Sequence, residues 1–147
     1  QTEGLGAALA RAHDLAGYIK VRLDNVNDRQ CRDFHVFRMA KQQKGAKPAD
    51  FDAALKTMME LPFVGVVEEY ELSLQALETV LKPHFPAIRC RNVRLNAASG
   101  VDLPLAERLA AMKAEIGVDL YRRLVAANMK DICLHQAAVT KLRELSP

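Results

Sequence analysis

The feature that most constrains the fold is a short apolar run, Phe63 to Val67, between two stretches that repeat apolar residues at helical spacing. The run is rich in β-branched residues, has no polar alternation, and is bounded by Pro62 and by Glu68-Glu69. Such a run is typical of a parallel strand that is buried on both faces. We therefore predict an α/β fold that contains one buried parallel strand at about residues 62–67.

This strand needs neighbours, because a buried amide or carbonyl without a hydrogen bond costs about 1–3 kcal/mol. The other strand candidate, Ile88 to Leu95, carries three arginines and breaks the alternation, so we interpret it as an irregular basic connection. We expect the missing strands to precede Gln1, which is not an initiator methionine. The chain is then expected to be the C-terminal part of a longer domain.

The rest of the chain is predicted to be mostly helical, with roughly five helices. Asp50 is expected to cap a helix that ends near Leu61, and Gly117 is expected to end a helix that begins near Pro104. A short helix and an exposed loop are expected between residues 21 and 48. The other predicted helices cover about residues 5–19, 70–81 and 118–142, the last with an interruption. The helix that begins near Pro104 has an apolar stripe of Leu105, Leu109, Met112 and Ile116, and the next helix is expected to face inward with Leu120, Leu124 and Ala127.

Composition excludes several classes of protein. The 147 residues are 50% hydrophobic and 27% charged, which fits one soluble globular domain. No apolar run approaches the ~20 residues that a membrane-spanning helix needs. The 21 basic and 18 acidic residues are spread along the chain, and a net charge of +3 is too small to indicate a nucleic-acid partner.

The three cysteines, Cys31, Cys90 and Cys133, are an odd number and lie far apart, so we expect reduced thiols and a cytoplasmic location. His35 and His135 follow two of these cysteines closely, which raises a zinc hypothesis. The spacing matches no paired zinc-finger pattern, so ordinary buried thiols are favoured and no metal is predicted. His35 would suit a general base, but a surface histidine is the favoured interpretation and no catalytic residue is assigned.

Four segments resemble motifs of the bacterial and Golgi-type sulfotransferases, in the family order. Residues 63–74 resemble the signature F-V-G-[LIV]-T-E-R-[FY]-D-E-S-[LM], and Asp24 to Arg29 resemble the upstream D-N-x-Q-x-R segment. Arg94 to Ala98 resemble the L-N-x-[ST] loop, and Asp119-Leu120-Tyr121 resemble the D-L-Y start of the last conserved helix. A predicted amphipathic helix lies between the last two segments, as in the family. The resemblance covers most of residues 20–128.

The resemblance implies a P-loop-like enzyme that moves a sulfuryl group from phosphoadenosine phosphosulfate (PAPS) to an acceptor hydroxyl. The acceptor would be a small molecule or a glycan, most often a carbohydrate. The family's phosphosulfate loop and its ribose-phosphate segment do not occur in these residues. Residues 1–147 would therefore be the C-terminal part of a single sulfotransferase domain, would need the upstream part of the same enzyme, and would be inactive alone.

The resemblance also assigns candidate site residues. Acceptor contact is implied for Asn25 and Arg29, and cofactor binding for Arg94, Leu95, Asn96, Ala97, Ala98 and Ser99. The guanidinium group of Arg94 suits a phosphate because it can bind two oxygens at once. The chain departs from the motifs at Ala98, where the family has a hydroxyl, and also at Asn27, Asp28, Val67 and Glu69.

Structural interpretations of the same residues stay open. Asn25 and Arg29 lie four residues apart and could simply hold the corner between a helix and a loop. The arginines between residues 88 and 95 could form a solvated basic edge. For the whole chain, the alternative to the enzyme is a non-catalytic helical module that binds another protein.

Overall fold

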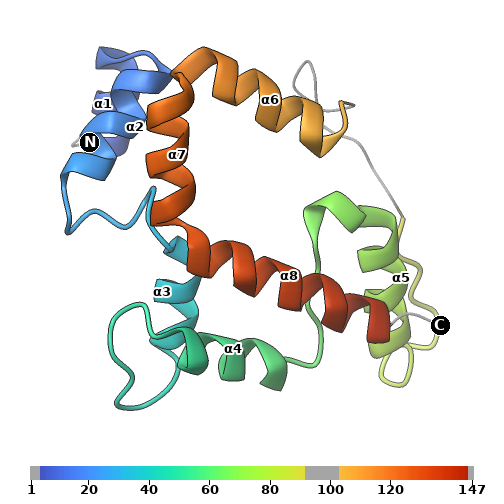
Figure 1. Ribbon diagram of the computed structural model, residues 1–147. Coiled ribbons are helices and arrows are strands. Elements are labelled where there is room, and N and C mark those ends of the chain that lie inside the picture. The colour runs from blue at the N-terminus through green and yellow to red at the C-terminus, as the bar shows by residue number, and fades with distance from the viewer. Residues whose placement is uncertain (1–3, 92–102, 146–147) are drawn as a thin grey trace. The chain divides into compact units, whose positions relative to one another are not determined.

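The computed structural model describes residues 4–91 and 103–145, and these residues form helices and connections without any β-strand (Figure 1). The predicted α/β fold with a buried parallel strand at residues 62–67 is therefore wrong. The elements of the described part are α1 (Leu5–Ala12), α2 (Leu15–Asp24), α3 (Phe34–Ala40), α4 (Phe51–Glu60), the 3-10 turn η1 (Val67–Glu69), α5 (Tyr70–Leu81), α6 (Leu105–Ile116), α7 (Val118–Ala127) and α8 (Met129–Glu144).

The backbone around Val66 explains why the apolar run forms no strand. Val66 is extended and 5% exposed, but its N–H donates to Ser73 Oγ at 2.9 Å. The same hydroxyl lies 3.0 Å from the Val66 carbonyl and 2.9 Å from the Glu69 carbonyl, and it can donate to one of them at a time. A side chain of α5 thus satisfies the backbone groups that a neighbouring strand would otherwise pair.

The chain divides into two compact units, each made of two separate stretches of sequence. Unit 1 comprises Gln1–Phe34 and Gly100–Met129, and unit 2 comprises His35–Ser99 and Lys130–Pro147. Helices α1, α2, α6 and α7 belong to unit 1, whereas α3, α4 and α5 and nearly all of α8 belong to unit 2. Each unit has its own hydrophobic core.

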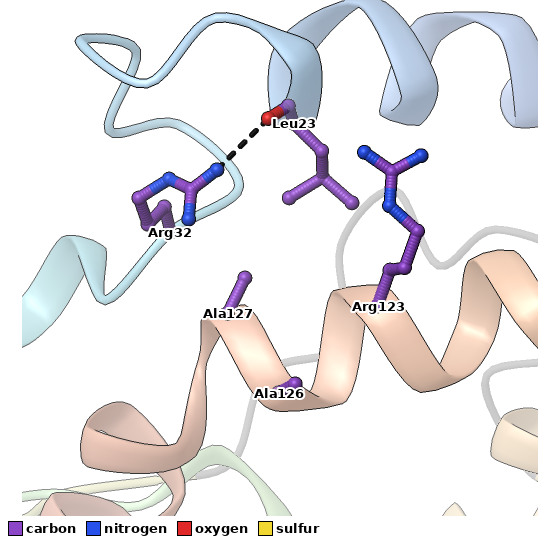
Figure 2. A pocket seen from close by; sticks show the side chains of 5 residues that line it. All are labelled: Leu23, Arg32, Arg123, Ala126 and Ala127. Carbon is purple, nitrogen blue, oxygen red and sulfur yellow. Dashed lines mark hydrogen bonds between the residues drawn. The ribbon is translucent and has the colours of Figure 1, made fainter.

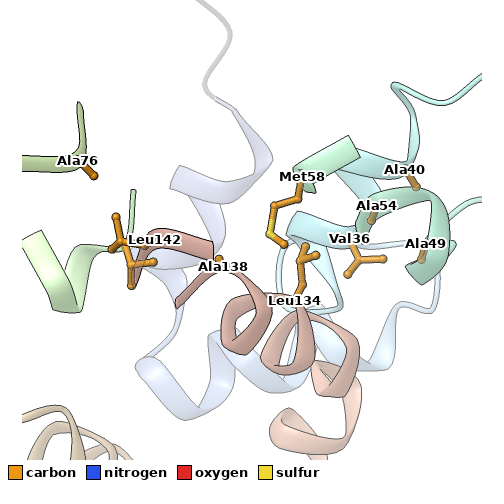
Figure 3. Close-up of a cluster of buried hydrophobic side chains, with 10 residues drawn as sticks. Val36, Ala40, Ala49, Ala54, Met58, Ala76, Leu134, Ala138 and Leu142 are labelled. Carbon is orange, nitrogen blue, oxygen red and sulfur yellow. The ribbon is translucent and has the colours of Figure 1, made fainter. Parts of the chain in front are cut away.

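The core of unit 2 is built around one face of α8, which presents Leu134, Ala138 and Leu142 at intervals of four residues (Figure 3). Val36 of α3 and Met58 of α4 pack against this face, and both are at most 1% exposed. The other buried members of this core are Ala40, Ala49, Ala54, Val66 and Ala76. Every one of these residues belongs to unit 2.

The core of unit 1 joins α2, α6 and α7. Its buried residues are Ile19 and Leu23 of α2 and Ile116 of α6. The apolar residues of α7 that the sequence predicts to face inward pack against this cluster, so that prediction is confirmed: Leu120, Leu124 and Ala127. On α6, by contrast, Leu105 and Leu109 are 41% and 39% exposed, although helical spacing predicts them on a buried stripe.

Several predicted helix ends are confirmed. Asp50 caps α4 by accepting a hydrogen bond from the N–H of Ala53, and Gly117 ends α6 with a φ of +83°, which favours glycine. The helix predicted over residues 5–19 is split, because Asp14 caps a new helix by accepting from the N–H of Gly17. None of the described helices is both long enough and apolar enough to cross a lipid bilayer.

Candidate functional site

The predicted acceptor residues Asn25 and Arg29 lie in the α2 corner, which we define as residues 24–33, beginning with the last residue of α2. Asn25 is the C-terminal cap position of α2, and its Oδ1 accepts from the N–H of Asn27 at 3.1 Å. The Asn25 carbonyl accepts from the N–H of Asp28 at 3.0 Å. These bonds are typical of a tight turn that asparagine stabilises.

A buried ion pair supports the α2 corner from within unit 1. Arg22, which is 6% exposed, donates to Asp28 Oδ2 at 2.5 Å and lies 5.0 Å from the centre of the Tyr18 ring. Burial pushes the pKa of Asp28 upward, but hydrogen bonds from Arg22 and from the N–H of Gln30 outweigh it and lower the pKa below its usual value. The pKa of Arg22 is raised, chiefly by its hydrogen bond to Asp28. Both side chains are therefore charged at neutral pH.

Residues at α7 and its C-terminal end hold the α2 corner from the other side. Arg123 Nη2 donates to Asp24 Oδ1 at 2.7 Å, although the two residues lie 99 positions apart. Asn128 accepts from the N–H of Asp33 at 3.1 Å and donates to the Cys31 carbonyl at 2.9 Å. The corner and α7 are therefore connected at both ends within unit 1.

Two segments that match the sulfotransferase motifs thus belong to the same unit. The α2 corner contains Asn25 and Arg29, and the first turn of α7 contains Asp119, Leu120 and Tyr121. Sequence reasoning missed Arg123 and Asn128, which connect the α2 corner to α7 and to its C-terminal cap. The one available signal was the predicted interruption after α7, where Asn128 serves as the C-terminal cap.

The third matched segment, residues 63–74, lies in unit 2. Ser73 occupies the serine position of the signature and binds the backbone of Val66, as described above. Glu69 stands where the signature has arginine and accepts from Arg143 of α8 at 2.9 Å. Val67 stands where the signature has threonine and is 80% exposed. The matched serine therefore has a structural role in the connection to α5.

The predicted cofactor residues Arg94, Leu95, Asn96, Ala97, Ala98 and Ser99 lie outside the described residues. The segment that leads toward them is attached to α5 through Glu78, whose Oε2 accepts from the N–H of Cys90 at 3.0 Å. The hydrogen bond from the Cys90 N–H lowers the pKa of Glu78 most, and a hydrogen bond from the Lys82 side chain lowers it further. Arg89 Nη1 lies 3.8 Å from Glu78 Oε1 and its side chain is 61% exposed, as a solvated basic edge requires.

The histidines and cysteines carry no metal-binding arrangement in the described part of the chain, where no group of three or more suitable side chains occurs. The His35 side chain is 72% exposed, and its Nδ1 lies 3.1 Å from Asp131 Oδ2. His135 Nε2 lies 3.3 Å from Glu68 Oε2. Burial raises the pKa of the Cys31 thiol, which keeps it protonated and unreactive at neutral pH.

Comparison with known proteins finds a relative that matches most of this chain. No protein-family model matches the chain, and no solved structure matches it. A protein of Archaeoglobus fulgidus, described only as an uncharacterized protein, is 36% identical over 143 residues. The match covers 95% of this chain and 56% of the relative, so the chain spans about half the length of that protein.

Proposed function

We propose that this chain is part of a PAPS-dependent sulfotransferase that acts on an acceptor hydroxyl, most often of a carbohydrate. One observation carries the proposal. The segments Asp24–Arg29 and Asp119–Tyr121, which match family motifs in the family order, belong to one compact unit, and Asp24 pairs with Arg123, which lies on α7 two residues beyond the second segment. A shared substrate site would require both motif segments in the same unit. The three cysteines are free thiols, which supports a cytoplasmic location.

In this proposal the matched residues have different roles. Bound PAPS would supply the sulfuryl group. Asn25 and Arg29 would position the acceptor, because the α2 corner is held by its own hydrogen bonds and by α7. Arg94 to Ser99 would contact the nucleotide, following the segment that Glu78 attaches to α5. The remaining cofactor contacts would come from upstream sequence, so the chain alone would be inactive.

The cofactor assignment is tested by calorimetric titration of the intact protein with adenosine 3′,5′-bisphosphate. Arg94→Ala should weaken binding about tenfold or more, because it removes a charge-assisted hydrogen bond worth about 1.5–3 kcal/mol. Arg89→Ala is the matched control on the same basic segment. Arg89 is largely exposed and near Glu78, so its loss should have a small effect that fades with salt. Equal losses at the two positions would contradict the assignment.

The acceptor assignment is tested by sulfuryl transfer from labelled PAPS to candidate hydroxyl acceptors. Asn25→Ala and Arg29→Ala should raise the acceptor KM while leaving the affinity for adenosine 3′,5′-bisphosphate unchanged. Unchanged kinetics in both variants, with the fold retained, would show that the two residues only hold the corner.

The second candidate is a non-catalytic helical module that binds another protein. Two observations favour it. The described residues contain no strand of the expected sheet. Three leucines at the start of α6 are exposed: Leu103, just before the helix, and Leu105 and Leu109 within it. The titration separates the candidates, because this module would not bind adenosine 3′,5′-bisphosphate.

A further inference from the structure

Unit 1 contains a pocket of about 380 Å³ between the C-terminal end of α2 and the last turns of α7 (Figure 2). Leu23, Ala126 and Ala127 supply apolar parts of its wall, and the guanidinium-bearing side chains of Arg32 and Arg123 supply the charged parts. Arg32 and Arg123 are not among the residues that the family motifs match. All five residues belong to unit 1.

Both arginines are held in position by the end of α2. Arg32 Nη2 donates to the Leu23 carbonyl at 2.8 Å, and Arg123 Nη2 donates to Asp24 Oδ1 at 2.7 Å. Each bond uses one of the five N–H donors of a guanidinium group. Figure 2 shows both side chains extending toward Leu23 from different segments. Their orientation therefore does not have to be set by a ligand, which lowers the entropic cost of binding one.

The charge around the pocket is not balanced. Two guanidinium groups line it, whereas one carboxylate, that of Asp24, is bound to one of them. Arg32 is also short of acceptors, because its Nε is buried and has no hydrogen-bond partner among the described residues. A second anionic group at this place would compensate charge that the chain leaves uncompensated.

We propose that this pocket binds a small molecule that carries one oxyanion group, a carboxylate, sulfate or phosphate ester. Its oxygens bind Arg32 and Arg123, and its neutral part lies on Leu23, Ala126 and Ala127. The planar donor edge of arginine suits oxyanions, which can accept two hydrogen bonds side by side. The apolar wall distinguishes such a molecule from a free inorganic ion. This proposal does not depend on the sulfotransferase proposal.

The test is an NMR titration of the 147-residue chain labelled with ¹⁵N-arginine. The ligands are sodium benzenesulfonate and sodium benzoate, with benzyl alcohol as the neutral control and sodium chloride to hold the ionic strength constant. Arg32→Lys and Arg123→Gln identify the two Nε–H signals. Both signals should shift saturably with the two anions and remain unchanged with benzyl alcohol. Inorganic sulfate should bind more weakly than benzenesulfonate, because it lacks the apolar part.

Matched variants make the titration decisive. Arg123→Gln should weaken benzenesulfonate binding at least tenfold, whereas Arg122→Gln, at the neighbouring position and outside the pocket, should change it less than twofold. Thermal unfolding checks that Arg123→Gln and Arg122→Gln both fold. A third variant, Arg32→Lys, keeps the positive charge but removes the guanidinium edge that can donate two hydrogen bonds at once. Absence of saturable shifts in the unmodified chain, or equal effects at Arg122 and Arg123, would overturn the proposal.

Discussion

Arg22 of α2 and Asp28 of the α2 corner form a buried ion pair, with 7% and 10% of their side chains exposed. Burying two charges is costly, and the cost is offset here because each charge meets the other and Asp28 accepts a further hydrogen bond from Gln30. Removing one partner would leave the other charge buried without compensation. The pair therefore makes the geometry of the corner, including Asn25 and Arg29, depend on the side chains of Arg22 and Asp28.

We expect Asp28→Asn to lower the free energy of unfolding of unit 1 by about 3–5 kcal/mol, because the Arg22 charge remains buried without a full partner. Urea unfolding at pH 7 measures the change. Asp119→Asn is the control, since that carboxylate is 97% exposed and pairs with exposed Arg122. An exposed ion pair contributes about 0–1 kcal/mol to the free energy of unfolding. Similar losses in the two variants would show that burial of the pair contributes little.

The ion pair between Arg22 and Asp28 is expected to make the free energy of unfolding fall in acid. The pKa of Asp28 in the folded chain lies below its usual value of about 4. Its contribution to stability is therefore fully present above about pH 4 and is lost as the pH falls through the lower folded pKa. Urea unfolding from pH 7 to pH 2 should show a smaller acid loss in Asp28→Asn than in the unmodified chain. An identical acid loss would mean that other carboxylates cause it.

At the element scale, side chains of α8 cap the ends of two other helices in unit 2. Asp131 of α8 accepts from the N–H groups of His35 and Val36 at 3.0 and 2.8 Å, at the start of α3. Lys141 of α8, which is 7% exposed, donates to three carbonyls at the end of α4: Met58, Met59 and Leu61. A carboxylate at one helix start and an ammonium at another helix end match the helix dipoles.

Lys141→Met should destabilise unit 2 by about 1–3 kcal/mol, because buried carbonyls lose their hydrogen bonds while the apolar stem is kept. Denaturant unfolding measures the loss. Lys56→Met serves as the control, since Lys56 on α4 is exposed and lies 3.8 Å from Glu60. The capping role would be contradicted by a Lys141→Met variant as stable as Lys56→Met.

The connection into α5 depends on one hydroxyl. Ser73→Ala should cost about 1–3 kcal/mol, because the buried N–H of Val66 loses its acceptor. Thr79→Ala, on the same helix, removes an exposed hydroxyl that binds a carbonyl four residues earlier, and should change stability by less than about 0.5 kcal/mol. Hydrogen exchange of the Val66 amide is an independent measurement of the same hydrogen bond. Unchanged protection of that amide in Ser73→Ala would contradict this account of the apolar run.

At the scale of the whole molecule, the chain has two hydrophobic cores, and each is formed by residues from two separate stretches of sequence. Unit 1 combines α1 and α2 with α6 and α7, and unit 2 combines α3 to α5 with α8. Neither core can therefore form from a continuous segment, and early truncation of α8 would remove the centre of unit 2.

Leu142→Ala tests this division. Leu142 is fully buried in the core of unit 2, so the substitution should cost about 2–5 kcal/mol. Hydrogen exchange should show the loss mainly at amides of unit 2. Leu23→Ala, at a residue 4% exposed in the core of unit 1, is the reciprocal variant and should act mainly on unit 1. Equal loss of protection in both units from either variant would contradict the presence of two cores.

The sequence by itself determined several helix boundaries, because their causes are local. Asp50 caps α4 with its own side chain, Pro83 follows the end of α5, and Gly117 takes the positive φ that ends α6. The interruption between α7 and α8 was also predictable. For Asn25 and Arg29, a corner between a helix and a loop was one of two interpretations that the sequence left open, and Asn25 is the C-terminal cap of α2.

The tertiary structure alone decided the state of residues 63–67 and the partners of the α2 corner. An apolar run of five residues fits a buried strand or a packed connection equally well, and the choice depends on what satisfies the Val66 backbone, here Ser73. The contacts of Asp24 with Arg123 and of Asp33 with Asn128 join residues 99 and 95 positions apart. Local spacing carries no information on such pairs, because they arise only when separate helices pack into one unit.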